Sequence, residues 1–276
     1  MNTISLTKHH ALANDFLVTF DALTGDLPAI ARRLCDRRRG VGADGLLIAS
    51  PEDGYDARMV LYNADGSRAE MSGNGIRCFV QALIASSAGA DHAVHESAPH
   101  SVRILTDAGE RVVEIVAQVS ASEILAAVDM GEVAAIAEPA DWQRIGADPM
   151  RPVAHVSLGN PHSVVAVDAV DDVDLLALGE IVPYVNLEIV EAGPEPDAIT
   201  MRVHERGAGI TEACGTGACA SAWSARAWGL VPADCAEITV HMVGGDAKVR
   251  VHHPSPGRVT LIGPAVFVGS ITMTLD

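Results

Sequence analysis

The sequence has few aromatic residues and few positive charges, and both shortages narrow the classes of protein to which it can belong. Aromatic residues make up 4% of the 276 residues and hydrophobic residues 49%, so a core must be built mainly from Ala, Val, Leu and Ile. Lys and Arg number 19 against 36 Asp and Glu, which gives a formal net charge of -17. Because nucleic acids and anionic membranes attract basic surfaces, we expect neither as a partner.

Long hydrophobic runs and regularly spaced cysteines are also missing. No apolar run approaches the length of a membrane span, and the N-terminal region has no signal-peptide core. The five cysteines lack the short repeated spacing of a disulfide framework or of a zinc site. We therefore expect a soluble, cytoplasmic protein with reduced thiols. The cysteines are Cys35, Cys78, Cys214, Cys219 and Cys235.

Signatures of cofactor and metal sites are absent as well. Lysine occurs only at Lys8 and Lys248, neither in a loop typical of a pyridoxal Schiff base, and there is no P-loop or H-E-x-x-H motif. The segment 40–45 matches G-x-G-x-x-G, but a basic stretch precedes it and a predicted strand follows it. A dinucleotide site needs a strand before the glycines and a helix after them. We expect no cofactor and no metal.

What the sequence does contain is one pattern that occurs twice. Both copies read E-x-[S/C]-G-x-G and are followed by a run with helix-forming composition. Their third residues, Ser72 and Cys214, lie 142 positions apart, which is close to half of the chain. We infer an internal duplication with two helix N-termini, whose free N–H groups could bind one anionic ligand. The copies and their helical runs are residues 70–75 with 76–85 and residues 212–217 with 218–228.

The chemistry that this pattern favours is proton transfer without a cofactor. Two helix N-termini can hold a carboxylate and stabilise the negative charge that develops when the adjacent C–H bond breaks. A thiol at such a place, Cys214, is expected to have a lowered pKa and to act as a base. Arg206 could bind a second carboxylate, and Glu205 could accept from an ammonium group.

Each polar residue also has a simpler interpretation. An Asn can be a turn residue, and Glu205 with Arg206 can form a surface ion pair. Recurrence at corresponding places in the two halves is what favours a site. The polar loop residues in question are Asn14, Asn63, Asn160 and Asn186.

Each half is otherwise predicted to consist of several strands around one long helix. Hairpin-like connections outnumber strand–helix–strand units, which predicts an α+β fold with mixed or antiparallel sheets. The border between the halves is expected near residues 116–122. Residues 258–262 are predicted to form one strand and residues 266–275 another, which could return to either half.

Five motifs resemble those of the diaminopimelate epimerases, and the resemblance covers essentially the whole chain. It implies two similar domains related by a pseudo-twofold axis, each a barrel-like sheet around a central helix, with the active site between them. We accordingly place the domains at residues 1–118, joined by the final strand 264–276, and at residues 119–263. The motifs are Asn63–Ser67, Ser72–Cys78, Gly159–His162, Glu205–Gly209 and Ala213–Gly217.

The resemblance also implies an activity and residue roles. Members of the family are cofactor-free isomerases of lysine biosynthesis that interconvert LL- and meso-diaminopimelate with two cysteines as acid and base, and a homodimer is compatible with the family. Ser72 and Cys214 stand at the positions of the two cysteines, while Glu205 contacts the substrate ammonium group and His162 lies near the bases. The residues implied to bind the reacting carboxylate of the substrate are Gly73, Asn74, Gly215 and Thr216. Those implied to bind its distal, non-reacting end are Asn63, Asn160, Asn186 and Arg206. Asn14 is a further predicted substrate-binding residue.

The chain departs from the family pattern at four positions. Ser72 replaces the first cysteine, Ala11 and Ala13 stand where glycines are usual, and Ile210 stands where glutamate is usual. A serine hydroxyl is a much weaker acid and base than a thiol unless a neighbour activates it. Three interpretations remain open: a natural Ser/Cys pair, as in some relatives in the proline racemase branch, a Cys→Ser variant made to trap a complex, or a divergent member. The divergent member would act on another amino acid or only bind a ligand.

Overall fold

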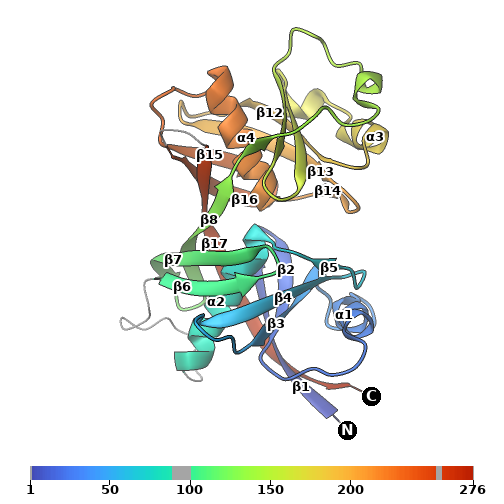
Figure 1. Cartoon of the computed structure of the whole chain (residues 1–276), viewed down its shortest axis with the longest axis vertical. Coiled ribbons are helices and arrows are strands. Elements are labelled where there is room, and N and C mark those ends of the chain that lie inside the picture. The colour runs from blue at the N-terminus through green and yellow to red at the C-terminus, as the bar shows by residue number, and fades with distance from the viewer. Residues whose placement is uncertain (1, 89–100, 253–256, 276) are drawn as a thin grey trace. The chain divides into compact units, whose positions relative to one another are not determined.

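The computed structural model describes residues 2–88, 101–252 and 257–275. The chain divides into two compact units, residues 1–128 with 263–276 and residues 129–262. The domain border expected at residues 118/119 falls inside β7 (Gly109–Ser120), which belongs to the first unit. Two strands, β8 (Glu123–Glu132) and β17 (Arg258–Leu275), each run from one unit into the other (Figure 1).

The sheet of the first unit closes on itself. The pairs β2–β3 and β4–β6 are parallel, whereas β1–β2, β3–β4, β6–β7, β7–β8 and β17–β1 are antiparallel. Because β8 also pairs with β17, the ring of strands is complete and the predicted mixed, barrel-like sheet is confirmed. The strands not yet given are β1 (Asn2–Ala11), β2 (Asn14–Thr19), β3 (Gly45–Ser50), β4 (Ala57–Asn63), the short β5 (Arg68–Ala69) beside β4, and β6 (Ser101–Thr106).

The second unit repeats this order of pairings. Its parallel pairs, β11–β12 and β13–β15, occupy the same places in the order as β2–β3 and β4–β6, and antiparallel pairs separate them. The repetition supports the internal duplication inferred from the two sequence motifs. The strands are β9 (Ala134–Ala135), β10 (Val153–Ser157), β11 (Pro161–Ala166), β12 (Asn186–Ala192), β13 (Ala198–Glu205), β14 (Gly209–Thr211), β15 (Glu237–Met242) and β16 (Gly245–Val251).

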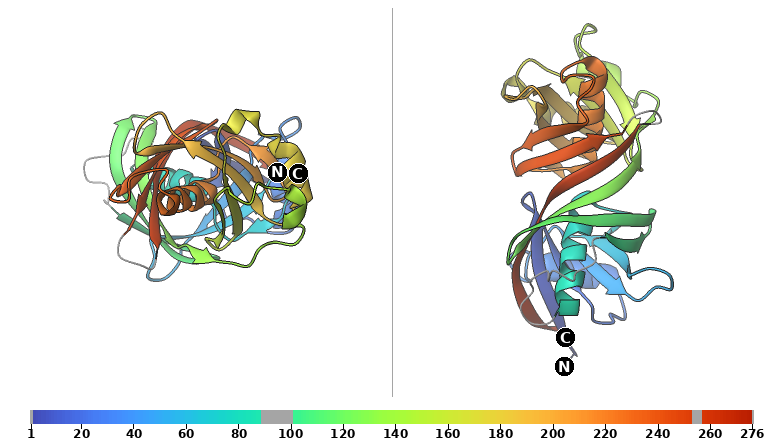
Figure 2. Two further views of the ribbon diagram at one scale, coloured as in Figure 1. Left: turned by 90° about the horizontal axis from the view of Figure 1, so that it is seen from above. Right: turned by 90° about the vertical axis from the view of Figure 1, so that its left-hand side faces the viewer.

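One helix lies inside each barrel, as the sequence predicts: α2 (Gly73–Ala88) in the first unit and α4 (Gly215–Trp228) in the second. Residues 73–82 of α2 are all buried, and a helix buried on every side belongs to a core. Figures 1 and 2 show each helix enclosed by the strands of its own unit. None of the helices in the described part of the chain is long and apolar enough to cross a membrane.

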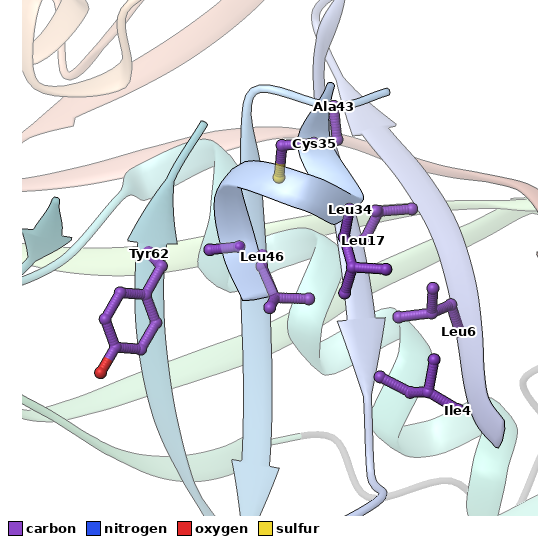
Figure 3. Packing of buried hydrophobic residues seen from close by; sticks show 9 residues of the cluster. Ile4, Leu6, Leu17, Leu34, Cys35, Ala43, Leu46 and Tyr62 are labelled. Carbon is purple, nitrogen blue, oxygen red and sulfur yellow. The ribbon is translucent and has the colours of Figure 1, made fainter. Parts of the chain in front are cut away.

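Two further helices cover the outer faces of the barrels. Helix α1 (Leu27–Cys35) packs Leu34 and Cys35 against Leu17 and Leu46 of the sheet beneath it (Figure 3). Helix α3 (Leu175–Ile181) packs in the same way, in a cluster with Leu187. Strands β3 and β12 therefore have helices on both faces. The short 3-10 turns are η1 (Trp142–Ile145) and η2 (Val170–Asp172).

The prediction of two separate strands at the end of the chain is wrong, because β17 is one continuous strand of 18 residues. Its first part pairs with β16 and its second part with β1. The Gly263-Pro264 pair accommodates Arg77 of α2: a Cβ on Gly263 would lie 3.0 Å from Arg77 Nη2, and Arg77 Nε donates to the Pro264 carbonyl at 3.2 Å. Gly and Pro thus mark a close contact with the central helix and not the end of a strand.

Candidate functional site

The two central helices begin with the same local geometry. Ser72 Oγ accepts from the Gly75 N–H at 3.0 Å, and Cys214 Sγ accepts from the Gly217 N–H at 3.4 Å. Each side chain is therefore held over the first turn of its helix, as an N-cap is. The prediction that Cys214 lies just before a helix is confirmed. The first N–H groups of each helix, at residues 73–74 and 215–216, have no partner within the helix and can bind an anion.

Beside Ser72, the first unit places an aromatic ring and a buried amide. A Cβ on Gly75 would lie 3.1 Å from Ser72 Cβ and 3.3 Å from the ring of the buried Phe16. Asn74 is buried, and its Oδ1 accepts from Arg77 Nη2 at 2.7 Å. Arg77, itself without exposed surface, also donates to the Gly73 carbonyl at 3.0 Å. The guanidinium thus fixes the first turn of α2.

The predicted residues Asn14 and Asn63 are connected to this turn through Asp44. Asn14 Oδ1 accepts from Asn74 Nδ2 at 3.4 Å, and Asn14 Nδ2 donates to Asp44 Oδ2 at 2.8 Å. The Asp44 carbonyl accepts from the Ala64 N–H at 2.9 Å, next to Asn63. Asn63 itself donates to Ser67 Oγ at 3.0 Å within the turn between β4 and β5.

The second unit joins four predicted site residues to one that the sequence analysis did not identify. Cys214 Sγ lies 3.5 Å from Thr216 Oγ1, which accepts from Asn160 Nδ2 at 3.2 Å. Asn160 Oδ1 lies 3.1 Å from His162 Nε2, and His162 Nδ1 lies 2.6 Å from Glu188 Oε1. The side chains of His162 and Glu188 are completely buried. Glu188 was missed because β12 reads as an alternating strand, in which an acid is expected to face solvent.

The environment of Cys214 contradicts the predicted lowering of its pKa. Burial raises the pKa of the Cys214 thiol well above its usual range, and the negative charges of Glu205 and Glu188 raise it further. Hydrogen bonds from Thr216 and from the Gly217 N–H act in the opposite direction but do not outweigh burial. The prediction considered the helix N-terminus and left out the desolvation of the thiol and the two nearby acids.

The turn between β13 and β14 carries the other predicted residues of this unit. Asn186, which is buried, accepts from the Arg206 N–H at 2.8 Å and so anchors the turn. Glu205 Oε1 accepts from Thr211 Oγ1 at 2.5 Å. Arg206 is exposed, and its guanidinium forms no ion pair with any residue that the structure describes, so the alternative of a Glu205–Arg206 pair is not observed.

The described ranges also contain no group of three or more His, Cys, Asp and Glu side chains arranged to hold a metal ion. Within the first unit the structure brings together Ser72, Gly73, Asn74 and Asn14, with Asn63 in the adjoining turn. Within the second it brings together Cys214, Gly215, Thr216, Asn160 and His162. Asn186 lies opposite His162 in the pairing of β11 with β12, and its side chain accepts from the Arg206 N–H.

Comparison with known sequences identifies one family. The sequence model of the diaminopimelate epimerases matches residues 6–136 and 154–268. The diaminopimelate epimerase of Desulfitobacterium hafniense is 35% identical over 96% of this chain and 96% of its own length. That of Thermosynechococcus vestitus is 38% identical over 98% of this chain and 99% of its own length.

Solved structures share the fold at low identity. A phenazine biosynthesis protein of the PhzF family from Bacillus anthracis matches with a TM-score of 0.77 at 17% identity, over 100% of both chains. A hydroxyproline epimerase from Agrobacterium vitis, solved with bound trans-4-hydroxy-L-proline, matches with a TM-score of 0.71 at 15% identity, over 99% of this chain and 93% of the other. Both support the α+β fold with two barrel-like units.

Proposed function

Because this chain belongs to the diaminopimelate epimerase family, we propose that it is a cofactor-independent isomerase that converts LL-diaminopimelate to meso-diaminopimelate, a step of lysine and peptidoglycan precursor biosynthesis. One observation carries the proposal: two equivalent helix N-termini are capped by Ser72 and by Cys214, both side chains that can exchange a proton. A reaction that removes a proton from one face of a carbon and returns one to the other face needs two such groups.

The proposed reaction begins with binding of the reacting carboxylate at the helix N-termini. Their N–H groups stabilise the charge that forms on the carboxylate when the α-hydrogen leaves. The Cys214 thiolate takes that hydrogen as a proton, and the electron pair of the C–H bond moves into the carboxylate to give an enolate. The Ser72 hydroxyl then donates a proton to the opposite face of the α-carbon, which inverts the centre. Glu205 is proposed to accept from the substrate ammonium group.

We propose that the distal end of the substrate is bound by Asn63, Asn160, Asn186 and Arg206. The exposed guanidinium of Arg206, which has no ion-pair partner in the described part of the chain, supports this role because it can bind a carboxylate bidentately. When the substrate buries this ion pair, truncation in Arg206→Ala should weaken binding of a diamino-dicarboxylate by about 2–5 kcal/mol. Binding of a short monocarboxylic amino acid should change far less. Calorimetry with both ligand types measures this, and equal losses would contradict a distal role for Arg206.

The activity itself is tested by chiral analysis. The protein is incubated in deuterated water with each diaminopimelate stereoisomer and, in parallel, with proline and alanine. We expect inversion and deuterium incorporation at the α-carbon of diaminopimelate only. Turnover of another amino acid instead would favour the divergent interpretation, and binding without deuterium incorporation would favour a binding protein.

We also propose a cytoplasmic location and a homodimeric state. The thiols of Cys35, Cys78, Cys214 and Cys235 support the location, because free thiols are typical of reducing compartments. Light scattering on the purified protein determines the oligomeric state.

A further inference from the structure

In the second unit, four hydrogen bonds in series lead from Glu188 to Cys214. The bonds pass through His162, Asn160 and Thr216, with lengths of 2.6, 3.1, 3.2 and 3.5 Å in that order. Glu188 Oε2 is buried and has no hydrogen-bond partner among the described residues. A fully buried carboxylate costs free energy unless a partner compensates it, so Glu188 is not explained by packing of β12.

The bonding partners determine where the hydrogen atoms lie. An amide oxygen only accepts, so Asn160 Oδ1 accepts from His162 Nε2–H. At the other ring nitrogen, the hydrogen bond between His162 Nδ1 and Glu188 Oε1 requires a second proton. The buried pair therefore holds one proton more than a neutral imidazole beside an ionised carboxylate.

The same rule gives the rest of the series a direction. Asn160 Nδ2 can only donate, and it donates to Thr216 Oγ1. The hydroxyl hydrogen of Thr216 is then available to Cys214 Sγ. Every donor points towards the sulfur atom, which is the arrangement that stabilises a thiolate and not a thiol.

We propose that Glu188 is a positioning residue: by its hydrogen bond to His162 Nδ1 it keeps the ring turned with Nε2–H towards Asn160, and so holds the hydrogen bonds through Asn160 and Thr216 directed at Cys214, which favours the thiolate. The use of that thiolate as a base rests on the proposed function, whereas the direction of the hydrogen bonds does not. The other groups that act electrostatically on Glu188 or Cys214 are Glu205 on β13 and the N-terminus of α4, which contains Gly217. A Cβ on Gly217 would lie 2.7 Å from Glu188 Oε1 and 3.3 Å from Cys214 Sγ, so carboxyl and thiol flank this one residue.

Two roles of Glu188 predict opposite results for Glu188→Leu. If Glu188 acted only through its negative charge, which raises the pKa of Cys214, its removal would increase the thiolate population. In the proposed role, leucine leaves His162 Nδ1 without a hydrogen-bond partner, the ring is no longer held, and the donors directed at Cys214 are lost, so the thiolate population should fall. Glu188→Gln is the conservative variant: its amide N–H can donate to His162 Nδ1 and keep Nε2–H towards Asn160, so the thiolate population should stay near that of the unmodified protein.

The test is the rate of iodoacetamide alkylation of Cys214 in the ligand-free protein, followed by peptide mass spectrometry across pH. At neutral pH we expect Glu188→Leu to slow alkylation by about three- to tenfold, since one pKa unit corresponds to about tenfold in thiolate, and Glu188→Gln to stay close to the unmodified rate. Cys235, which is half-buried and away from the series, serves as the internal reference. An unchanged or faster rate would overturn the proposal.

Two variants and one spectroscopic readout separate positioning from a structural effect. Asp246→Asn removes a carboxylate 2.8 Å from His241 on β15 and should leave Cys214 unaffected. Thr216→Val removes the last donor but leaves the buried pair intact, and it should also slow alkylation; an unchanged rate would overturn the proposal even if Glu188→Leu did not fold. Nitrogen-15 NMR should find a hydrogen on His162 Nε2 in the unmodified protein, and a ring with its hydrogen on Nδ1 alone would also overturn it. Because no substrate is present, these results do not depend on the epimerase activity.

Discussion

Ser72 and Cys214 occupy equivalent positions, but their surroundings differ chemically. Both cap the third N–H of a central helix. Beside Ser72 lies the ring of Phe16, whereas beside Cys214 lies the carboxyl group of Glu188, itself paired with His162. The ionisable groups that could tune proton transfer are thus found on the Cys214 side. Exchange of the α-hydrogen should accordingly be faster than inversion for the stereoisomer whose hydrogen faces Cys214.

Restoring a thiol at position 72 tests this difference. A thiol is a far better acid and base than a hydroxyl near neutral pH, and a well-placed general acid contributes about 10²–10⁴-fold. We therefore expect Ser72→Cys to increase the rate of stereoisomer interconversion by about that factor, measured by chiral chromatography. Cys214→Ala serves as the control and should abolish deuterium exchange. If Ser72→Cys left the rate unchanged or lowered it, Ser72 would belong to a different reaction.

Among the elements, the hairpin that joins β1 to β2 carries backbone strain. Its two turn residues, Leu12 and Ala13, have φ of 55° and 64°, values that favour glycine. Ala13→Gly should therefore increase the free energy of unfolding by about 0.5–1 kcal/mol, measured by urea denaturation. Ala11→Gly is the matched control: Ala11 is a buried strand residue, so the same substitution should destabilise. Destabilisation by both variants would show that the turn is not strained.

The second strand of this hairpin is held by an ion cluster in which Asp15 is largely buried and Arg37 is exposed. Burial raises the pKa of Asp15, but hydrogen bonds and charges from Arg37 and Lys8 outweigh burial and lower the pKa to about 2. A lowered pKa stabilises the fold above the unfolded value near pH 4, and the stabilisation is lost as pH falls through about 2. Asp15→Asn should therefore cost about 2 kcal/mol at neutral pH, and the difference should close below about pH 2. Urea titrations at several pH values measure this, with the exposed Asp53→Asn as a control that should change little.

The sequence predicts an element well when local signals define it, and poorly when contacts with distant parts of the chain define it. The helix starts at Ser72 and Cys214 follow from local composition, and so does α3, because caps and propensities act within a few residues. Glu188 could not be placed in this way. Strand β12 has α3 on one face and α4 on the other, so alternation along the strand does not separate buried from exposed positions. The continuity of β17 was missed for a related reason, since the contact of Gly263 with Arg77 spans most of the chain.

At the scale of the whole molecule, the repeated motif predicts the two similar units, because each copy sits at the start of one central helix. What the sequence does not reveal is that the barrels share strands. The ring of the first unit is completed by β8 and β17, which both continue into the second unit, where β17 pairs with β16. Closure of a barrel is a property of distant pairings, and no local pattern encodes it.

Because β17 runs through both units, it affects how the protein folds during synthesis on the ribosome. Residues 266–275 form the partner of β1, so β1 lacks this partner until those residues have been synthesised. The first unit therefore cannot close before residues 266–275 are available, although most of its residues emerge earlier. During that interval β1 presents an unpaired edge, which is a template for association with other chains. Nascent chains of this protein should thus depend on chaperones until residues 266–275 have left the exit tunnel.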